Sequence, residues 1–330
     1  MQKVHHIIGA DLSKKTIDLF SNHLQAHICI DNHLSGFKKL LRWLQLNQIN
    51  PSELLIVMEH TGLYSFCFEA FLHQHEIGFT KVNALAIKRS MGLIRGKSDK
   101  IDARRIADYG NEKKGKLVME VPASKETQRL QLLFATRERL VKQKAGLINA
   151  VKEYQNIGLK QTDSVLKAQK RLIKTFENEI AKLEAEMKTI IETNPQLQQN
   201  YQLLQSIKGV GKILALAALI KTRNFTRFIN ARKFACFCGT APFENTSGTS
   251  IRGRTKVSHL ADKQMKTLLD LSAKTAIQYD KELREYYLRR TSEGKSKMST
   301  INIVRNKILF RMFAVIKRQT PFVENYLEAA

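Results

Sequence analysis

The sequence predicts an α/β domain at the N-terminus, an antiparallel helical hairpin in the middle and a mostly α-helical domain at the C-terminus. Three observations predict this order. Short apolar runs alternate with amphipathic stretches up to residue 116, the long stretches within residues 117–200 lack proline and keep helical spacing, and residues 201–330 hold several further helical patterns. We therefore divide the 330 residues into domains of 1–116, 117–200 and 201–330.

The first domain opens with three predicted strands. Apolar or alternating positions cover residues 4–10, 16–20 and 25–30, which is typical of a meander. Four more elements follow: a helix over 36–47, an almost wholly apolar strand over 53–59, a helix over 62–73 and a strand over 78–82, before another helix opens at 84–91. This alternation predicts a mixed sheet flanked by helices, with its polar site near the carboxyl ends of the strands.

Two carboxylates stand where the strand pattern predicts burial. Asp11 follows the first apolar strand, and Glu59 closes the fourth. A buried carboxylate is costly unless a cation compensates its charge. Both residues are therefore candidate ligands of a metal ion.

A second acidic pair, Asp99 and Asp102, stands at the start of a predicted helix. Side chains three residues apart leave a helix on the same face. Basic residues crowd this pair: Arg95, Lys97, Arg104 and Arg105. Carboxylates that hold divalent cations, set among bases that attract a polyanion, are what a metal-dependent phosphodiester site needs. The structural alternative is an ordinary helix start, where the macrodipole favours acidic residues.

The middle domain reads as two long helices over 124–158 and 162–193. The second has apolar residues at alternating spacings of three and four, typical of a coiled-coil seam, and Gly158 to Asp163 fits a reversal of the chain. Asn194-Pro195 ends the pattern. Such a hairpin is a spacer or an oligomerisation arm, and we favour the arm.

The C-terminal domain begins with Gly209-Val210-Gly211-Lys212, which leads into an apolar helix over 213–220. A Gly-x-Gly turn between helices is typical of a helix-hairpin-helix, in which backbone N–H groups hold a nucleic-acid phosphate. A plain turn is the alternative. A further helix is expected over 225–237.

Residues 238–254 form a predicted loop rich in glycine, serine and threonine that runs into Arg252 and Arg254. A serine beside a glycine can approach phosphorus closely, and nearby arginines can stabilise the charge that develops there. Simple phosphate binding by the loop is the alternative, and the residues alone leave the choice open. Helices are expected over 263–278, 282–290 and 300–318, with a basic turn around Lys295 that is either a nucleic-acid surface or a solvated face.

The charge balance points to a polyanionic partner. Lys and Arg number 55 against 30 Asp and Glu, a net charge of +25, and residues 201–330 alone hold 24 basic and 9 acidic residues. Nucleic acid is favoured over a membrane surface because no apolar run has the length of a spanning helix. Without a signal-peptide pattern the protein is expected in the cytoplasm. We expect the four cysteines to be buried free thiols.

The chain resembles the transposases of the insertion sequence 110 family over nearly its whole length. The matching pieces are Gly9-Ala10-Asp11 with Lys14, Met58-Glu59 with Thr61-Gly62, Lys97 to Ala103, Ile207 with Gly209-Val210-Gly211, Gly239 with Pro242, Ser247-Gly248 and Gly294-Lys295. Their order and spacing together carry the resemblance.

This resemblance implies a RuvC-like (ribonuclease H-like) first domain whose Asp, Glu, Asp, Asp tetrad falls on Asp11, Glu59, Asp99 and Asp102. It also implies Mg²⁺ or Mn²⁺ at the tetrad, a catalytic serine at Ser247, a non-coding bridge RNA that pairs with donor and target DNA, and a homo-oligomer, dimer or tetramer. The family loop often reads Ser-Ser-Gly-Gly, so Ser250 is the alternative nucleophile. The expected nucleic-acid-binding residues are Lys97, Arg104, Arg105, Gly209, Gly211, Lys212, Arg252, Arg254, Lys256 and Lys295.

Our hypothesis from the sequence is an insertion-sequence transposase that cuts and rejoins DNA through a phosphoserine intermediate. Two alternatives stay open. The first is a RuvC-type nuclease or junction resolvase that uses water as its nucleophile, and the second is a non-catalytic scaffold that binds nucleic acid.

Overall fold

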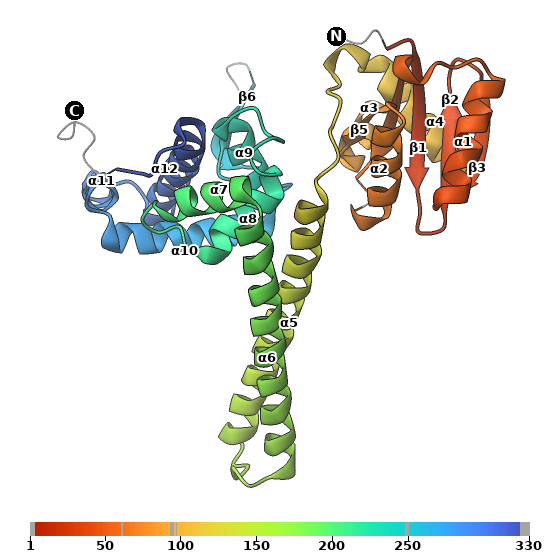
Figure 1. The fold of residues 1–330 in the computed structure, drawn as a ribbon. Helices are drawn as coiled ribbons and strands as arrows, with labels where there is room; N and C mark the ends of the chain where they lie inside the picture. Colours follow the sequence, from red (N-terminus) through yellow and green to blue (C-terminus); the bar gives the residue numbers. More distant parts are fainter. Residues whose placement is uncertain (1–3, 61, 93–95, 97, 248–250, 324–330) are drawn as a thin grey trace. The chain divides into compact units, whose positions relative to one another are not determined.

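A computed structural model describes residues 4–60, 62–92, 96, 98–247 and 251–323 of the chain. It divides into two compact units, an N-terminal unit of Met1–Pro122 and a C-terminal unit of Ala123–Ala330 (Figure 1). The first holds a mixed sheet flanked by helices and the second is mostly helical, which confirms the predicted order of classes. Among the described residues, no helix combines the length and the apolarity that crossing a membrane requires.

The N-terminal unit is built on a five-stranded sheet with the order β3-β2-β1-β4-β5. The strands β1 (His6–Leu12), β2 (Thr16–Ser21) and β3 (Ala26–Asp31) pair antiparallel, whereas β4 (Leu54–Glu59) and β5 (Gly78–Val82) run parallel to β1. The carboxyl ends of β1, β4 and β5 therefore meet at one edge of the sheet.

Helices cover both faces of this sheet. On one face, α1 (Leu34–Leu46) and α2 (Phe66–Gln74) bury Phe37, Leu40 and Phe68 against alternate residues of the strands. On the other face, α3 (Ala84–Ser90) and α4 (Asp99–Glu112) pack on Ile7, Val57 and their neighbours. Each strand alternates between the two cores, as its period of two requires. Three short 3-10 turns, Pro51–Glu53, Gly62–Ser65 and Lys114–Lys116, connect the elements.

In the C-terminal unit, α5 (Lys125–Asn156) and α6 (Ser164–Thr193) form a long antiparallel hairpin, which projects from the remaining helices of this unit (Figure 1). Ser124 and Asp163 cap the two helices at their N-termini. The predicted reversal between them is confirmed. At the root of the hairpin, Leu130, Met187 and Ile191 join the core of the unit.

The described part of this unit holds six further helices: α7 (Pro195–Gln205), α8 (Lys212–Thr222), α9 (Ala231–Cys238), α10 (Lys263–Tyr279), α11 (Lys281–Ser292) and α12 (Lys297–Arg318). The helix α8 lies at the centre, and nearly every residue from Leu214 to Thr222 is buried. A helix that is apolar on all sides belongs in the middle of a core.

Two predictions about this architecture were wrong. The helix expected over 225–237 begins only at Ala231, because Arg223, Asn224 and Phe225 adopt positive φ angles that end a right-handed helix. Residues 238–254 were expected to be a loop, but β6 (Pro242–Ser247) and β7 (Ile251–Val257) form a hairpin. Their glycines and hydroxyl residues suggest a loop locally, yet antiparallel pairing satisfies the backbone groups of both arms.

The cysteines were only partly predicted. All four are free, as expected, but Cys29 and Cys67 are exposed and only Cys238 is fully buried. Cys29 belongs to the edge strand β3, and an edge strand leaves one of its sides open to solvent.

Candidate active site

Asp11 and Glu59 lie side by side at the carboxyl ends of parallel strands. The register of β1 and β4 pairs Ala10 with Met58, so the next residue of each strand is the acidic one. Both follow, at a spacing of two, residues that face α4: Gly9 in β1 and Val57 in β4. The two carboxylates therefore share the face of the sheet that α4 covers.

The helix α4 brings Asp99 and Asp102 to this edge. Ser98 caps the helix by accepting a hydrogen bond from Ile101 N, which places both acidic residues in its first turn. The helix then runs back along β1. A Cβ atom at Gly9 would stand 2.2 Å from Ala103 O and 2.2 Å from Ala107 N, so only glycine allows this close approach.

The four carboxylates influence one another electrostatically. Burial first, and then the negative charges of Asp102, Asp99 and Glu59 in that order, raise the pKa of Asp11 from 3.8 to about 6. Burial and then Asp102 also raise the pKa of Glu59. A cluster of acids in which neighbouring negative charges raise the pKa of Asp11 and Glu59 is a site that would favour a cation.

Two of the predicted basic residues belong to the same helix. Arg105 donates from Nη1 to Asp102 Oδ1 at 2.8 Å and from Nη2 to the carbonyl of Gly96 at 3.0 Å, so it braces the acidic pair. Arg104 is exposed and its guanidinium lies 5.6 Å from the ring centroid of Phe20. Arg95 and Lys97 lie outside the described residues.

Sequence reasoning missed a fifth carboxylate, Asp18. It pairs with Asp11 across β1 and β2, is 8% exposed, and contributes to the raised pKa of Asp11. Its Oδ1 lies 2.7 Å from Nε2 of His27. The signal was present, because Asp18 is the one charged residue in the apolar stretch Thr16 to Phe20. The same criterion had selected Asp11 and Glu59.

The donor set suits a divalent metal ion. Carboxylate oxygens are the ligands that Mg²⁺ and Mn²⁺ prefer, and the mutual pKa effects show that the four groups share one region. Among the described residues no three acidic, histidine or cysteine side chains stand close enough to form a closed ligand set. Asp11, Glu59, Asp99 and Asp102 could hold an ion after small rotamer changes, for which the exposed side chain of Asp99 has room.

Ser247 is the last residue of β6, in the C-terminal unit, whereas the four carboxylates belong to the N-terminal unit. The backbone register pairs it with Ile251 at the end of the hairpin. Ser250 lies outside the described residues, as do the side chains of Ser247, Arg252 and Arg254. Lys256, further down β7, is exposed.

The predicted Gly-x-Gly turn joins α7 to α8. Gly209 has a φ of +89°, and a Cβ there would stand 2.7 Å from Ser272 O, so the turn packs tightly on α10. Gly211 is the N-cap of α8 and offers no side-chain cap to the first N–H groups of the helix. Gly211 and Lys212 are exposed and border a cavity of about 640 Å³. This turn thus has the open helix N-terminus that a phosphate-binding turn needs.

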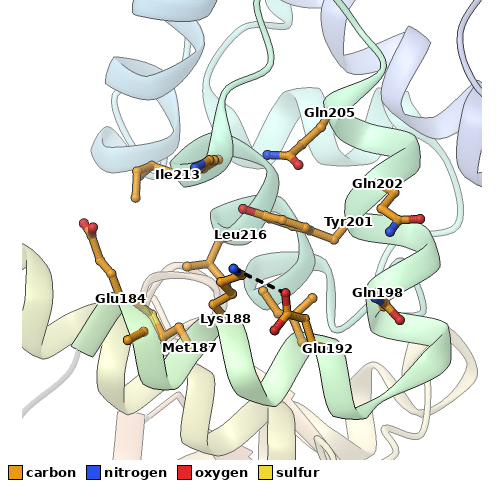
Figure 2. A pocket seen from close by; sticks show the side chains of 13 residues that line it. Glu184, Met187, Lys188, Glu192, Gln198, Tyr201, Gln202, Gln205, Ile213 and Leu216 are labelled. Atoms are coloured by element: carbon orange, nitrogen blue, oxygen red, sulfur yellow. Dashed lines mark ion pairs between the residues drawn. The ribbon is translucent and has the colours of Figure 1, made fainter. Parts of the chain in front are cut away.

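A second cavity, of about 530 Å³, lies between α6, α7 and α8 at the root of the hairpin (Figure 2). The ring of Tyr201 lies along it, and Lys188 and Glu192 form an ion pair at 3.6 Å on one side. Burial and then the charge of Glu184 raise the pKa of Tyr201. Of the predicted site residues that the structure describes, only Lys212 lines this cavity, so it stands apart from the predicted chemistry.

The late basic turn is open to solvent, and Lys295 is exposed there. In the helix before it, Tyr286 packs against the core and its ring receives two cations, Lys307 at 4.6 Å and Arg289 at 5.7 Å. Its aromatic face is therefore already occupied by side chains of the chain itself.

Comparisons with known proteins match both units. The family model of DEDD transposases of the IS110 type, described as "Transposase", matches residues 8–154, and the model described as "Transposase IS116/IS110/IS902 family" matches residues 201–288. The pilin gene-inverting protein of Moraxella bovis is 28% identical over 96% of this chain and 97% of its own length. The transposase for insertion sequence element IS1111A of Coxiella burnetii is 24% identical over 68% of each chain.

The two family models cover the acidic cluster and the Gly-x-Gly turn in chain order, and the relative from Moraxella bovis spans both units. The chain belongs to the IS110 family of transposases and is an enzyme of the transposase and site-specific recombinase class.

Proposed function

We propose that this enzyme cuts and rejoins DNA through a phosphoserine intermediate formed by Ser247, with a metal ion held by the acidic tetrad. The observation that carries the proposal is the meeting of Asp11, Glu59, Asp99 and Asp102 at one edge of the sheet, where burial and then the charges of the other three raise the pKa of Asp11 to about 6. Such a cluster is unfavourable without a cation, so a functional reason for keeping it is needed.

Asp11, Glu59, Asp99 and Asp102 would hold one or two Mg²⁺ or Mn²⁺ ions. When bound, such an ion acts as a Lewis acid on the oxygens of the scissile phosphate. Arg105 keeps Asp102 oriented through its hydrogen bond at 2.8 Å. Exposed Arg104 adds positive charge near the strand of DNA that enters this edge.

Ser247 supplies the nucleophile in this proposal. Its Oγ forms a bond to phosphorus as the bond from phosphorus to a deoxyribose oxygen breaks. The serine proton passes to that departing oxygen, which leaves as a hydroxyl group. An incoming DNA hydroxyl then attacks phosphorus and restores the serine. Because one phosphodiester replaces another, the bond energy is retained for rejoining. Arg252, whose backbone pairs with that of Thr246 beside Ser247, and Arg254, two residues further along β7, would stabilise the charge on the phosphoryl oxygens.

The architecture supports the finer assignments. The mixed five-stranded sheet with acidic residues at the ends of β1 and β4 supports a RuvC-like fold for the first domain. The hairpin of α5 and α6, closed by ion pairs such as Arg137 with Glu184 at 2.8 Å, supports a coiled-coil arm that assembles a homo-oligomer. We retain the functional division into residues 1–116, 117–200 and 201–330.

Donor and target DNA are the proposed substrates, and a bridge RNA is the proposed guide. The net charge of +25 supports binding to either polyanion. The exposed residues Gly211, Lys212, Lys256 and Lys295 would contact phosphates, together with Gly209, Lys97, Arg252 and Arg254. In the turn before α8, the first backbone N–H groups of the helix would be the phosphate donors.

The test compares Ser247→Ala with Ser250→Ala, its matched neighbour, and with Asp102→Asn. The substrate is a plasmid that carries the coding segment with its native flanks, and the readouts are recombined product and protein–DNA adduct that survives denaturant. We expect Ser247→Ala and Asp102→Asn to abolish both, while Ser250→Ala keeps both. If Ser247→Ala still cleaved DNA and no adduct formed, the hydrolytic nuclease would be favoured instead.

A further inference from the structure

The base of the β6–β7 hairpin is held by two asparagines of α12. Thr240, two residues before β6, is fully buried. Its carbonyl accepts hydrogen bonds from Nδ2 of Asn302 and from Nδ2 of Asn306, each at 2.8 Å. Its Oγ1 also donates to Oδ1 of Asn306 at 2.8 Å. Asn306 thus uses both ends of its amide on a single residue.

The second arm of the hairpin is also anchored to the helical core. After β7, Asp262 N donates to Phe237 O at 2.8 Å, and Asp262 Oδ2 pairs with Lys221 Nζ at 2.8 Å. Gly239 ends α9 with a φ of +66°, and a Cβ there would stand 2.2 Å from Cβ of Ala261. Both arms therefore leave the helical core from anchored points.

The contacts at Thr240 exceed what burial alone requires. One hydrogen bond satisfies a buried carbonyl, and an apolar side chain at either partly buried asparagine of α12 would pack at lower desolvation cost than the amide. The two asparagines lie four residues apart, so one helix face presents both to the same residue. Because hydrogen bonds are directional, the bonds from these two asparagines fix the angle at which the chain enters β6.

That angle matters because Ser247 lies seven residues beyond Thr240. An extended strand of that length spans about 20 Å, so a tilt of about 5° at its base moves the far end by about 2 Å. A displacement of about 1 Å in a reacting group can reduce a rate about 100-fold.

We propose that Asn302 and Asn306 are positioning residues for the serine nucleophile. They hold Thr240 and thereby aim the strand that carries Ser247. This inference rests on the proposed role of Ser247 and names residues outside its hairpin on which that role depends.

The test uses the full-length protein with three substitutions. Asn306→Leu removes both amide contacts at similar volume, Thr240→Val removes the hydroxyl donor, and Thr240→Ser retains that donor. Thr267→Val is the matched control, because Thr267 is exposed on α10 and bonds only locally to Lys263 O. The readouts are single-turnover adduct formation at saturating DNA, DNA affinity, and hydrogen exchange of the amides of β6 and β7.

We expect Asn306→Leu and Thr240→Val to slow adduct formation about 100-fold, with DNA affinity unchanged and faster exchange confined to the hairpin. Thr240→Ser and Thr267→Val should behave as wild type. If Asn306→Leu does not fold, Thr240→Val decides alone.

Wild-type rates and exchange in Asn306→Leu and Thr240→Val would overturn the inference. Adduct formation by Ser247→Ala would overturn the proposed function instead. The exchange measurement separates the two failures, because it reports the anchoring of the hairpin whatever the nucleophile is.

Discussion

At the scale of single residues, the acidic cluster combines a functional arrangement with a cost in stability. Asp11 has a pKa of about 6 in the folded chain against 3.8 as the reference value, and burial is the main cause. The folded state therefore binds this proton more tightly than the unfolded chain does. The resulting stabilisation is complete below about pH 4 and is lost as the pH rises through about 6.

This linkage predicts the effect of Asp11→Asn without divalent ions. At pH 7.5 the variant should be more stable than wild type by roughly 1 kcal/mol, after discounting the shift for partial exposure. At pH 4 the two proteins should have the same stability. Urea denaturation at both pH values measures the difference, with Asp31→Asn, an exposed carboxylate, as control. If the variant were less stable than wild type at pH 7.5, the ionised Asp11 carboxylate would not destabilise the folded chain as we expect.

The residues to which we assign a role also differ in how well the sequence predicts them. Asp11 and Glu59 were predictable because each interrupts an apolar strand pattern, and Asp18 carried the same signal unused. Asn302 and Asn306 had no such signal. Two polar residues in a helix with basic and apolar neighbours are unremarkable locally, and their partner Thr240 lies more than 60 residues earlier.

At the scale of elements, the site depends on how closely α4 packs on the sheet. Gly9 in β1 allows contact with the backbone of Ala103 and Ala107, and Gly110 in α4 fits against Ile7 and Val57. This packing sets the height of the first turn of α4 above Asp11.

Gly9→Ala should therefore separate α4 from β1 and move Asp99 and Asp102 away from Asp11. We expect a loss of about 2–3 kcal/mol in the free energy of unfolding, because the obstructing atoms are backbone, together with loss of recombination. Gly115→Ala is the control, since nothing lies within 4 Å of a Cβ there. Chemical denaturation and the plasmid assay measure the two effects. If Gly9→Ala and Gly115→Ala were equally stable, α4 could move away from β1 without loss of stability.

Periodicity predicted most elements because the hydrophobic pattern decides them. The strands of the first domain and the helices α5, α6, α8, α10 and α12 all follow such patterns. The β6–β7 hairpin was missed because its stability comes from pairing between two largely polar arms, one of which contains a glycine. Local composition cannot report such a pairing.

At the scale of the whole molecule, charge is the property that the sequence predicts most directly. With a net charge of +25, DNA affinity should fall linearly with the logarithm of salt concentration, as phosphate contacts release counterions. The arrangement of the two units around DNA is beyond the reach of periodicity or composition, because it depends on partners.

Individual phosphate contacts can be counted from that dependence. Lys212→Ala and Lys256→Ala should each reduce the salt slope by about 1, since each removes one contact. Lys182→Ala is the control, because Lys182 is 73% exposed and pairs with Glu179 on α6. Binding titrations between 50 and 200 mM salt, roughly the range where such slopes are resolved, provide the measurement. An unchanged slope in Lys212→Ala would remove the turn before α8 from the interface.

The repulsion within the acidic cluster has a consequence for the spread of the insertion sequence that encodes this enzyme. Because the four carboxylates repel one another, a copy that loses Asp11 is expected to fold at least as well as an active copy. Such a copy would keep its basic surface and still occupy the same DNA. Inactivated genes of this kind would therefore encode durable competitors, and ordinary mutation alone would supply the element with its own inhibitors.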